Sequence, residues 1–373
     1  MEPLVDVIIA VHTETRPIAR AVASILDHNA AAINVWVVAH NIAPDEITNQ
    51  LGQWASDPRV KLLEFRDGIH SPAGPFNFGI ASSTAPFFAV LGSDDSLEAG
   101  AIDSWLALQR KVDAAMVIAR IYYVGRGFES SPPIRILKSG VLNPVKDRLA
   151  YRSAPLGIIS REAFGQLRFT EGLESGEDLA YVTRMWFSKE KIAFDRFGPT
   201  YKGHNDAEDR VTHASRTIDK DFRFLNEIID TPWFAELSDS ARLAIVVKII
   251  RIHVFDAIFA RVQLKPWTRE EHAALAEVLN RLLRVAPKAL RLLSRIDQEV
   301  LVAATADSPG YPDSPGDDLP KLMAKRRHFA SLAVLLPRNP FFLLHRQAPL
   351  RTLAAGYLVM MIPRNKRRPQ GAS

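Results

Sequence analysis

Cysteine is absent from the 373 residues of this chain. Its absence excludes a disulfide framework, a thiolate metal site and a cysteine nucleophile, and it suits a reducing compartment. The first residues enter an apolar run at once, without the basic segment, long apolar core and cleavage site of a signal peptide. We therefore expect a cytoplasmic protein.

Long apolar runs are missing as well. The run at residues 243–262 is interrupted by Lys248, Arg251, His253 and Asp256, which predicts a packed core helix instead of a membrane span. Hydrophobic residues make up 47% of the chain and charged residues 24%, as in an ordinary globular protein. The length exceeds the size at which one core stops growing, so two domains are expected.

Acidic residues are missing from the last part of the chain. Residues 319–373 contain eleven Lys and Arg side chains and no Asp or Glu. Because the net charge of the whole chain is +5, the first 318 residues carry −6. The basic character belongs to the C-terminal part alone, which argues against nucleic acid as a partner of the main domain and for an anionic surface near the C-terminus.

The first part of the chain alternates strand and helix patterns with short connections. Strand patterns occur at residues 4–11, 35–39, 60–64, 87–91, 115–124, 156–160 and 192–197. Helical patterns occur at residues 17–26, 44–54, 76–81, 97–112 and 161–166, and again after Asp178. This alternation predicts an α/β fold with a mainly parallel, Rossmann-like sheet. Residues 125–147, rich in Gly, Pro and Ser, predict a surface loop.

Strand patterns end near residue 216. Apolar stripes at helical spacing follow at residues 222–229, 241–262, 269–285 and 288–303. Asp-Ser-Pro-Gly occurs at residues 307–310 and again at 313–316, which is typical of a linker. We therefore predict an α/β domain at residues 1–215, a helical domain at 216–306, a linker at 307–320 and a basic amphipathic tail at 321–373.

The apolar strand at residues 87–91 ends in Gly92, Ser93, Asp94 and Asp95. Open α/β sheets bind ligands at the carboxyl ends of their strands. Paired carboxylates there suit Mg²⁺ or Mn²⁺, with water and a substrate's phosphates completing the coordination. A polar turn that caps the next helix is the alternative interpretation.

A second acidic pair, Glu177 and Asp178, stands just before a helical pattern. Acids near a helix start favour the helix dipole, and Ser175 can act as a cap, so capping is again the alternative to a catalytic role. A polar segment at residues 201–213 follows the last strand pattern and contains His204 and Arg210.

Taken in this order, the motifs resemble the family 2 glycosyltransferases of GT-A fold over residues 3–213. The opening strand and loop, residues 5–12, resemble the family's donor-facing start, and Asn77-Phe78-Gly79 resembles its N-x-G element. Residues 92–95 resemble its DxD-type metal site, and Glu177-Asp178 its acidic pair at a helix start. The resemblance implies an inverting enzyme that moves a sugar from a nucleotide diphosphate sugar, with a UDP-sugar favoured, to a cell-envelope or exopolysaccharide acceptor.

The resemblance also implies residue roles. The residues expected to bind the donor are Val11, His12, Thr13, Glu14, Asn41, Asn77, Gly79, Ser93, Asp94 and Arg210. Asp95 and His204 would hold Mg²⁺ or Mn²⁺, which neutralises the charge that develops on the leaving diphosphate. Asp178 would take the proton of the acceptor hydroxyl, and Glu177 would orient acceptor or base.

Two positions depart from the family pattern. The second strand ends in His40-Asn41 where acidic residues usually hold the base, which leaves the amide of Asn41 to bond a base edge. Gly92 replaces the first acid of the metal motif.

Two other functions compete with sugar transfer. A sugar-phosphate nucleotidyltransferase would use a glycine-rich loop after the first strand, but residues 12–15 contain no glycine. A catalytically inactive nucleotide-binding membrane adaptor is disfavoured by the acids retained at both motifs.

The C-terminal part predicts peripheral docking on an anionic membrane surface, where a lipid-linked acceptor would also be found. Basic clusters at residues 325–327 and 364–368 flank apolar runs at 329–336, 341–344 and 353–362. None of these runs approaches the roughly 20 residues that span a bilayer, so they can only lie in its interface. Packing of the runs against the helical domain is the alternative.

Overall fold

The structure, a computed structural model, describes residues 2–136, 138–204, 216–264, 268–305, 318–327 and 332–361. Its larger sheet has seven strands in the order β10-β6-β9-β4-β1-β2-β3. Their bounds are β1 (Val5–Val11), β2 (Ile33–His40), β3 (Val60–Phe65), β4 (Phe87–Gly92), β6 (Met116–Ala119), β9 (Gly157–Ser160) and β10 (Ile192–Asp195).

The larger sheet is mainly parallel, as the sequence predicts. Strand β9 is the exception, because it runs antiparallel to both β4 and β6. It starts at Gly157, which has φ 136° and lies so close to β6 that an added Cβ would sit 1.9 Å from the Val117 carbonyl oxygen. Only glycine tolerates this backbone conformation and this approach.

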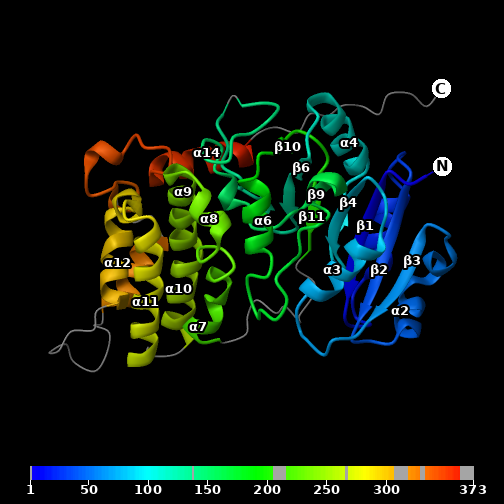
Figure 1. Ribbon diagram of the computed structural model, residues 1–373, viewed down its shortest axis with the longest axis horizontal. Coiled ribbons are helices and arrows are strands. Elements are labelled where there is room, and N and C mark those ends of the chain that lie inside the picture. Colours follow the sequence, from blue (N-terminus) through cyan, green and yellow to red (C-terminus); the bar gives the residue numbers. More distant parts are fainter. Residues whose placement is uncertain are drawn as a thin grey trace.

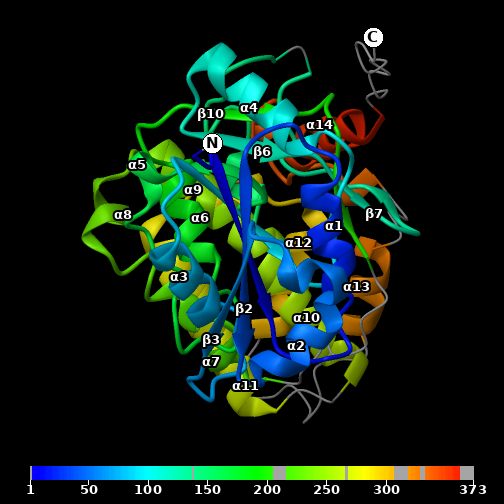
Figure 2. The ribbon, with the colours of Figure 1, turned by 90° about the vertical axis from the view of Figure 1, so that its right-hand side faces the viewer.

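Helices cover both faces of the larger sheet. One face carries α1 (Ile18–Leu26), α2 (Pro44–Leu51) and α4 (Ala101–Val112). The other carries α3 (Ala73–Ser82), the short α5 (Arg161–Phe164) and α6 (Leu179–Trp186). Figure 2 shows α3 on one side of β2 and β3, with α1 and α2 on the other. The helix predicted at 44–54 ends at Leu51 and continues as the 3₁₀ turn η1 (Gly52–Ser56).

A second, smaller sheet corrects three predictions. Its strands, in the order β5-β11-β7-β8, are β5 (Ser96–Leu97), β11 (Tyr201–Gly203), β7 (Ile121–Tyr123) and β8 (Gly127–Phe128). The helix predicted from residue 97 begins only at Ala101, because Ser96 and Leu97 pair with β11. The strand predicted at 115–124 divides between the two sheets at Arg120, and the polar segment after residue 200 begins as a strand.

The helical region begins near residue 218 and differs in detail from the prediction. Its elements are α7 (Ile218–Asp221), η4 (Arg223–Leu225), α8 (Pro232–Glu236), α9 (Asp239–Ile249), the π-helical turn η5 (Ile250–Val254), α10 (Phe255–Leu264), α11 (Arg269–Val285), η6 (Ala289–Leu292) and α12 (Arg295–Thr305). The single helix predicted at 241–262 is thus α9 and α10 joined by a π-turn.

The helical region lies beside the sheet domain and shares a core with it (Figure 1). One continuous hydrophobic cluster joins Tyr181 and Trp186 of α6 to Ile245 of α9, Val254 of η5 and Leu282 of α11. Residue 215 therefore does not separate two independent cores.

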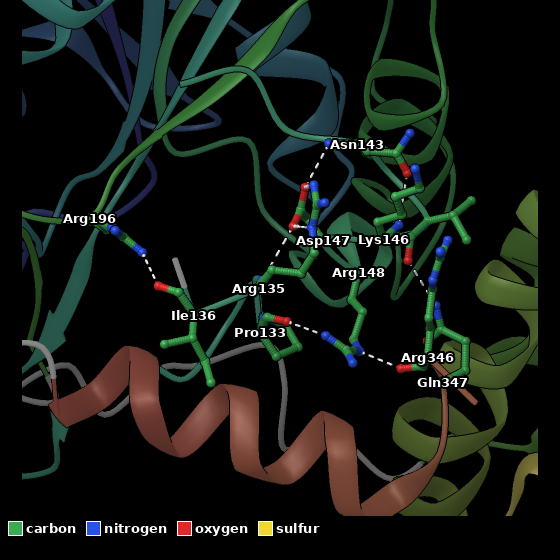
Figure 3. Close-up of polar contacts among 11 residues, drawn as sticks. Pro133, Arg135, Ile136, Asn143, Lys146, Asp147, Arg148, Arg196, Arg346 and Gln347 are labelled. Carbon is green, nitrogen blue, oxygen red and sulfur yellow. Dashed lines mark hydrogen bonds and ion pairs between the residues drawn. The ribbon is translucent and has the colours of Figure 1, made fainter. Parts of the chain in front are cut away.

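The described C-terminal elements fold back onto the rest of the chain. They are α13 (Asp318–Arg327), η7 (Leu332–Val334), η8 (Pro340–Phe342) and α14 (Pro349–Met361). Figure 3 shows Arg148 donating from Nε to the Arg346 carbonyl and from Nη1 to the Pro133 carbonyl, each at 2.8 Å. Val334 of η7 and Val359 of α14 are buried in the hydrophobic cluster shared with the helical region, so the inner face of this segment packs on the rest of the chain.

The outer face of the segment remains apolar. Phe341 is 91% exposed and Leu344 77%, so membrane docking stays a prediction. The basic cluster at residues 364–368 lies outside the described residues. Among the helices that the structure describes, none has both the length and the apolar character needed to cross a bilayer.

Candidate active site

The first acidic pair lies at the carboxyl end of β4. The Asp95 N–H donates to the Gly92 carbonyl at 3.0 Å, which folds the Asp95 carboxylate back over the turn. A Cβ at Gly92 would lie 2.7 Å from Asp95 Oδ2. Glycine at this position therefore leaves the space that the Asp95 carboxylate occupies. This is a physical reason for Gly92 in place of the first acid of the metal motif.

Asp95 accepts hydrogen bonds on both carboxylate oxygens. The Tyr201 hydroxyl donates to Oδ2 at 2.5 Å, and the His204 backbone N–H donates to Oδ1 at 2.9 Å. Burial raises the pKa of Asp95, while these two bonds act in the opposite direction. Sequence reasoning missed Tyr201, because its role depends on the pairing of β11 with β5 and β7.

Asp95 and His204 are the candidate cation ligands at this centre. His204 lies next to Asp95, with its imidazole Nε2 2.9 Å from Ser96 Oγ. Within the described ranges, no cluster of three or more His, Asp or Glu side chains is arranged to hold a metal ion. Mg²⁺ is commonly bound through one or two carboxylates plus substrate phosphates, so the residues present fit a cation that a diphosphate helps to hold.

Asp94 is held by two arginines that the sequence did not single out. Arg16 Nη1 lies 2.8 Å from Asp94 Oδ2, and Arg20 donates to the Asp94 backbone carbonyl. Arg16 precedes α1 and Arg20 lies in its first turn. Two arginines four residues apart, close in sequence to the end of the first strand, are a signal that sequence reasoning could have used. Ser93 beside them is buried.

The opening loop lies beside this turn, as predicted. Ala10 of β1 pairs with Gly92 of β4, so the residues after β1 start next to Ser93. Val11 is buried, whereas His12 and Glu14 are exposed. Thr13 Oγ1 contacts Thr15 Oγ1 at 2.8 Å. Their donor-binding roles stay predictions.

The ends of β2 and β3 form a second polar cluster. Asn41 has φ 58°, and its Oδ1 accepts from the N–H groups of Asp67 and Gly68 at 3.1 and 3.0 Å. His40 Nε2 lies 2.8 Å from Asp67 Oδ1. Asp67, which follows β3, therefore brings an acid to the strand end where the sequence lacks one. For Asn41 to contact a nucleotide base directly, its side chain would have to give up some of these hydrogen bonds and form new ones with the base.

Asn77 and Gly79 of the N-x-G element contribute hydrogen bonds and close packing to this fold. The Asn77 side chain donates to the Phe169 carbonyl at 3.0 Å and to Glu171 at 2.8 Å, and it accepts from the Phe169 N–H at 2.9 Å. At Gly79, a Cβ would lie 2.4 Å from Ile8 Cγ2, so glycine permits close packing of α3 on β1. The loop anchored by Asn77 leads to the second acidic pair.

Glu177 and Asp178 line a pocket of about 870 Å³ between the sheet domain and the helical region. Asp178 is the N-cap residue of α6, and its side chain makes no capping hydrogen bond. Both a catalytic role and a favourable effect of these acids on the helix dipole stay predictions. Phe224, His253 and Asp256 line the same pocket. We call this cavity the acid-pair pocket.

The electrostatics of the acid-pair pocket are unusual. Burial raises the pKa of Asp178 to about 8, and the Glu177 carboxylate adds to the rise. Burial also raises the pKa of Glu177. Lys248 of α9 opposes the rise at Asp178, although burial lowers the pKa of its own ammonium to about 8. Perturbed groups of this kind in a pocket mark candidates for acid–base chemistry.

The structure thus groups the predicted residues around two centres. Asp94, Asp95 and His204 meet at the end of β4, and Glu177 and Asp178 meet in the acid-pair pocket, whose described lining includes neither Asp94 nor Asp95. Arg210 lies outside the described residues. Sequence reasoning missed Tyr201, Arg16, Asp67 and Lys248, whose roles depend on the tertiary fold.

Comparison with known proteins adds independent information. The family model described as glycosyl transferase family 2 matches residues 6–168. No curated protein gave a match. Among solved structures, residues 1–349 of TarS from S. aureus share 15% identity with this chain at a TM-score of 0.65, covering 87% of this chain and 91% of that one.

The same TarS fragment has also been solved with UDP-GlcNAc and with UDP, and each complex matches this chain with a TM-score of 0.67 and 15% identity. At this identity the likeness shows the fold. The family match covers most strands of the larger sheet and the Asp94-Asp95 turn, and the likeness to the TarS fragment over most of the chain shows a GT-A-like fold followed by a helical C-terminal region.

Proposed function

We propose that this enzyme transfers a sugar from a nucleotide diphosphate sugar, with a UDP-sugar favoured, to a hydroxyl group of a cell-envelope saccharide or lipid-linked acceptor. One observation carries the proposal: the fold holds two carboxylate centres, a pair at the end of β4 in which Asp94 is buried and Asp95 half-buried, and a second pair in the wall of a sugar-sized pocket. The TarS complexes with UDP and UDP-GlcNAc support the choice of donor.

The first centre is assigned to the donor. Asp95, with His204 beside it, would hold Mg²⁺ or Mn²⁺, which supplies positive charge for the leaving diphosphate when bound. Asp94, Ser93 and residues 11–14 border the same turn and are assigned to the nucleotide sugar. Arg16 and Arg20 contact Asp94 and thereby stabilise this turn.

The second centre is assigned to the acceptor. As the acceptor oxygen bonds to the anomeric carbon, the bond from that carbon to the diphosphate oxygen breaks and its electron pair leaves with the diphosphate. Asp178 takes the hydroxyl proton, and Glu177 orients the acceptor. Attack from the face opposite the leaving group inverts the anomeric centre.

The acid-pair pocket suits a saccharide. Its volume of about 870 Å³ lies within the range of small-molecule sites. Phe222, Phe224 and Phe259 supply apolar wall, and carboxylates supply hydrogen-bond acceptors for hydroxyl groups.

The C-terminal segment is assigned to a membrane surface. Phe341 and Leu344 are largely exposed, and residues 319–373 carry basic side chains without acids. Exposed apolar groups beside basic ones favour an anionic bilayer. We infer peripheral docking of a cytoplasmic enzyme.

A binding screen tests the proposal. UDP, UDP-GlcNAc and other nucleotide sugars are titrated by calorimetry with and without Mn²⁺, and release of UDP from UDP-GlcNAc to water is then followed. Mn²⁺-dependent binding with slow hydrolysis is expected. Mn²⁺-dependent binding without any hydrolysis or transfer would favour the inactive adaptor instead.

A further inference from the structure

A narrow apolar groove, here called the α14 groove, lies between α14 and the loop that contains Ile134 and Ile136. Those two side chains line it from the loop, and Ala355, Leu358, Val359 and Met361 line it from α14. Figure 3 shows the Ile136 side chain pointing toward α14. The groove has a volume of about 190 Å³. This is below the usual range of small-molecule sites, so the groove suits a single hydrocarbon chain.

Arg196, which follows β10, is the polar residue among the described residues that line the groove. Its Nη1 donates to the Ile136 carbonyl at 2.9 Å, and its guanidinium lies over the Phe197 ring at 4.5 Å. Within the described part of the chain, no carboxylate pairs with Arg196. Its Nε and Nη2 are therefore left to donate to an anion beside the groove.

The helix that forms one wall of the groove is apolar on two faces. Ala355 and Val359 are buried against the rest of the chain. Leu353, Tyr357 and Met361, which follow each other at four-residue spacing, are exposed, Tyr357 by 56% and Met361 by 62%. A surface helix usually carries polar side chains opposite its buried face. An exposed apolar face of this kind is typical of a contact with a membrane or with another protein.

The charges around α14 favour an anionic bilayer over a second copy of this chain. Arg346 and Arg351 are exposed, and residues 319–373 contain no acid. Two copies that met through this face would bring their arginines together without carboxylates from the same segment, and like charges across an interface are unfavourable. An anionic lipid surface supplies the opposite charge.

We propose that the α14 groove binds an acyl chain of an anionic phospholipid, with the lipid phosphate on Arg196. The apolar walls take the chain, the guanidinium donates to phosphate oxygens, and the exposed face of α14 lies in the bilayer interface. This inference rests on the proposed membrane docking. It adds to that docking a defined lipid site, which Arg196 of the sheet domain and α14 of the C-terminal segment form together.

The test uses dihexanoyl phosphatidylglycerol, a short-chain anionic lipid, dissolved as monomers with the full-length protein. Calorimetry should show saturable binding of this lipid. Glycerophosphoglycerol, which is the same head group without acyl chains, should bind much more weakly. Absence of saturable lipid binding, or equal binding of the head group alone, overturns the proposal.

Two variants locate the bound lipid. Arg196→Gln should weaken its binding about fivefold, because one basic group beside the phosphate is lost. Ile136→Ser removes apolar wall from the groove and should also weaken binding, and Ile136 is exposed enough for this variant to stay folded. Arg284→Gln, which removes an exposed arginine of α11, is the matched control, with no change expected. Thermal unfolding checks each variant, and unchanged lipid binding in folded Arg196→Gln or Ile136→Ser overturns the proposal.

Sedimentation velocity of the lipid-free protein examines the competing occupant, a second copy of the chain. The protein should sediment as a monomer. A dimer that Tyr357→Arg dissociates would assign the exposed face of α14 to a partner copy and would overturn the lipid site.

Failure of the lipid site differs from failure of membrane docking. If the full-length protein sediments with phosphatidylglycerol vesicles but does not bind the short-chain lipid, docking stands and the lipid site falls. If the short-chain lipid binds and Arg196→Gln weakens it, but the protein does not sediment with vesicles, the lipid site stands and docking falls.

Discussion

At the scale of single residues, Asp95 and Asp178 are both half-buried carboxylates with raised pKa values, but their partners differ. Asp95 accepts bonds from Tyr201 and from the His204 N–H, which favour its charged form. Asp178 faces the like charge of Glu177, and Lys248 opposes that effect. The surroundings of Asp95 suit a cation ligand, and those of Asp178 suit a proton acceptor.

Asp95→Asn should lower turnover by at least about 100-fold, because it removes the charged ligand from the donor centre. Calorimetry should show that UDP no longer binds more tightly when Mn²⁺ is added. Asp113→Asn, which changes an exposed acid far from the site, is the control. Near-normal turnover of the Asp95 variant would exclude Asp95 as the metal ligand.

Asp178→Asn should keep UDP and Mn²⁺ binding yet lose about 10²–10⁴-fold in transfer, since a general base acts only on the chemical step. In the native enzyme kcat/KM should rise with pH and level off above about 8, because only the carboxylate form of Asp178 accepts a proton. A variant that loses stability but keeps its activity per folded molecule would instead assign Asp178 a structural role.

At the scale of elements, short irregular segments bring the functional side chains together. The three-residue strand β11 brings Tyr201 and His204 to Asp95. The π-turn brings His253 to Lys248. Asn77 in α3 anchors the loop that leads to Glu177.

Asn77→Ala should lower the free energy of unfolding by about 1–3 kcal/mol, because the buried Phe169 N–H loses its partner. Urea denaturation measures the loss. Ser82→Ala in the same helix removes one bond to the Phe78 carbonyl and should cost less. Weaker UDP binding at unchanged stability would instead place Asn77 in direct contact with the donor.

At the scale of the whole molecule, α14 and the part of the acid-pair pocket beside α7 lie at opposite ends, whereas α13 lies near the pocket, with Arg327 over the ring of the pocket residue Phe259. Figure 1 shows α14 at the top and α7, whose Asp221 lines the pocket, at the bottom, and Figure 2 shows the same arrangement. Docking through the α14 end of the C-terminal segment would hold the α7 end of the pocket away from the bilayer. An acceptor that extends from the membrane, such as a saccharide chain, fits this arrangement better than a short lipid-linked sugar.

Sedimentation with vesicles tests docking without removing buried contacts. Truncation after Pro320 would expose the partners of Met323, Ala348 and Val359, which are buried, so the truncated protein should lose stability. The double variant Phe341→Ser and Leu344→Ser should instead stay folded and bind anionic vesicles more weakly than the native protein. Added salt should weaken binding of the native protein.

Val302→Ser in α12 is the matched control for this experiment, because Val302 is 65% exposed and lies outside the C-terminal segment. Equal sedimentation of the double variant and the native protein, or equal binding to neutral and anionic vesicles, would contradict docking through this face.

The sequence by itself determined the α/β class, the parallel strands, the place of the acids at the end of β4 and the start of the helical region. These features follow from local periodicity and from residue types at strand ends, which act over a few residues. The same reasoning predicted a single helix at 241–262 and one strand at 115–124, because it has no means to detect a π-turn or a chain that changes sheets.

Only the tertiary structure decided which groups surround the acids. Tyr201 and Asp95 are 106 residues apart, and Asp178 and Lys248 belong to different regions of the chain. Whether a carboxylate near a helix start is a cap or a base depends on burial and on the charges that face it, and both arise when distant elements pack. The C-terminal segment likewise has a buried and an exposed apolar face only in the folded chain, where Val334 and Val359 are buried and Phe341 and Leu344 are exposed.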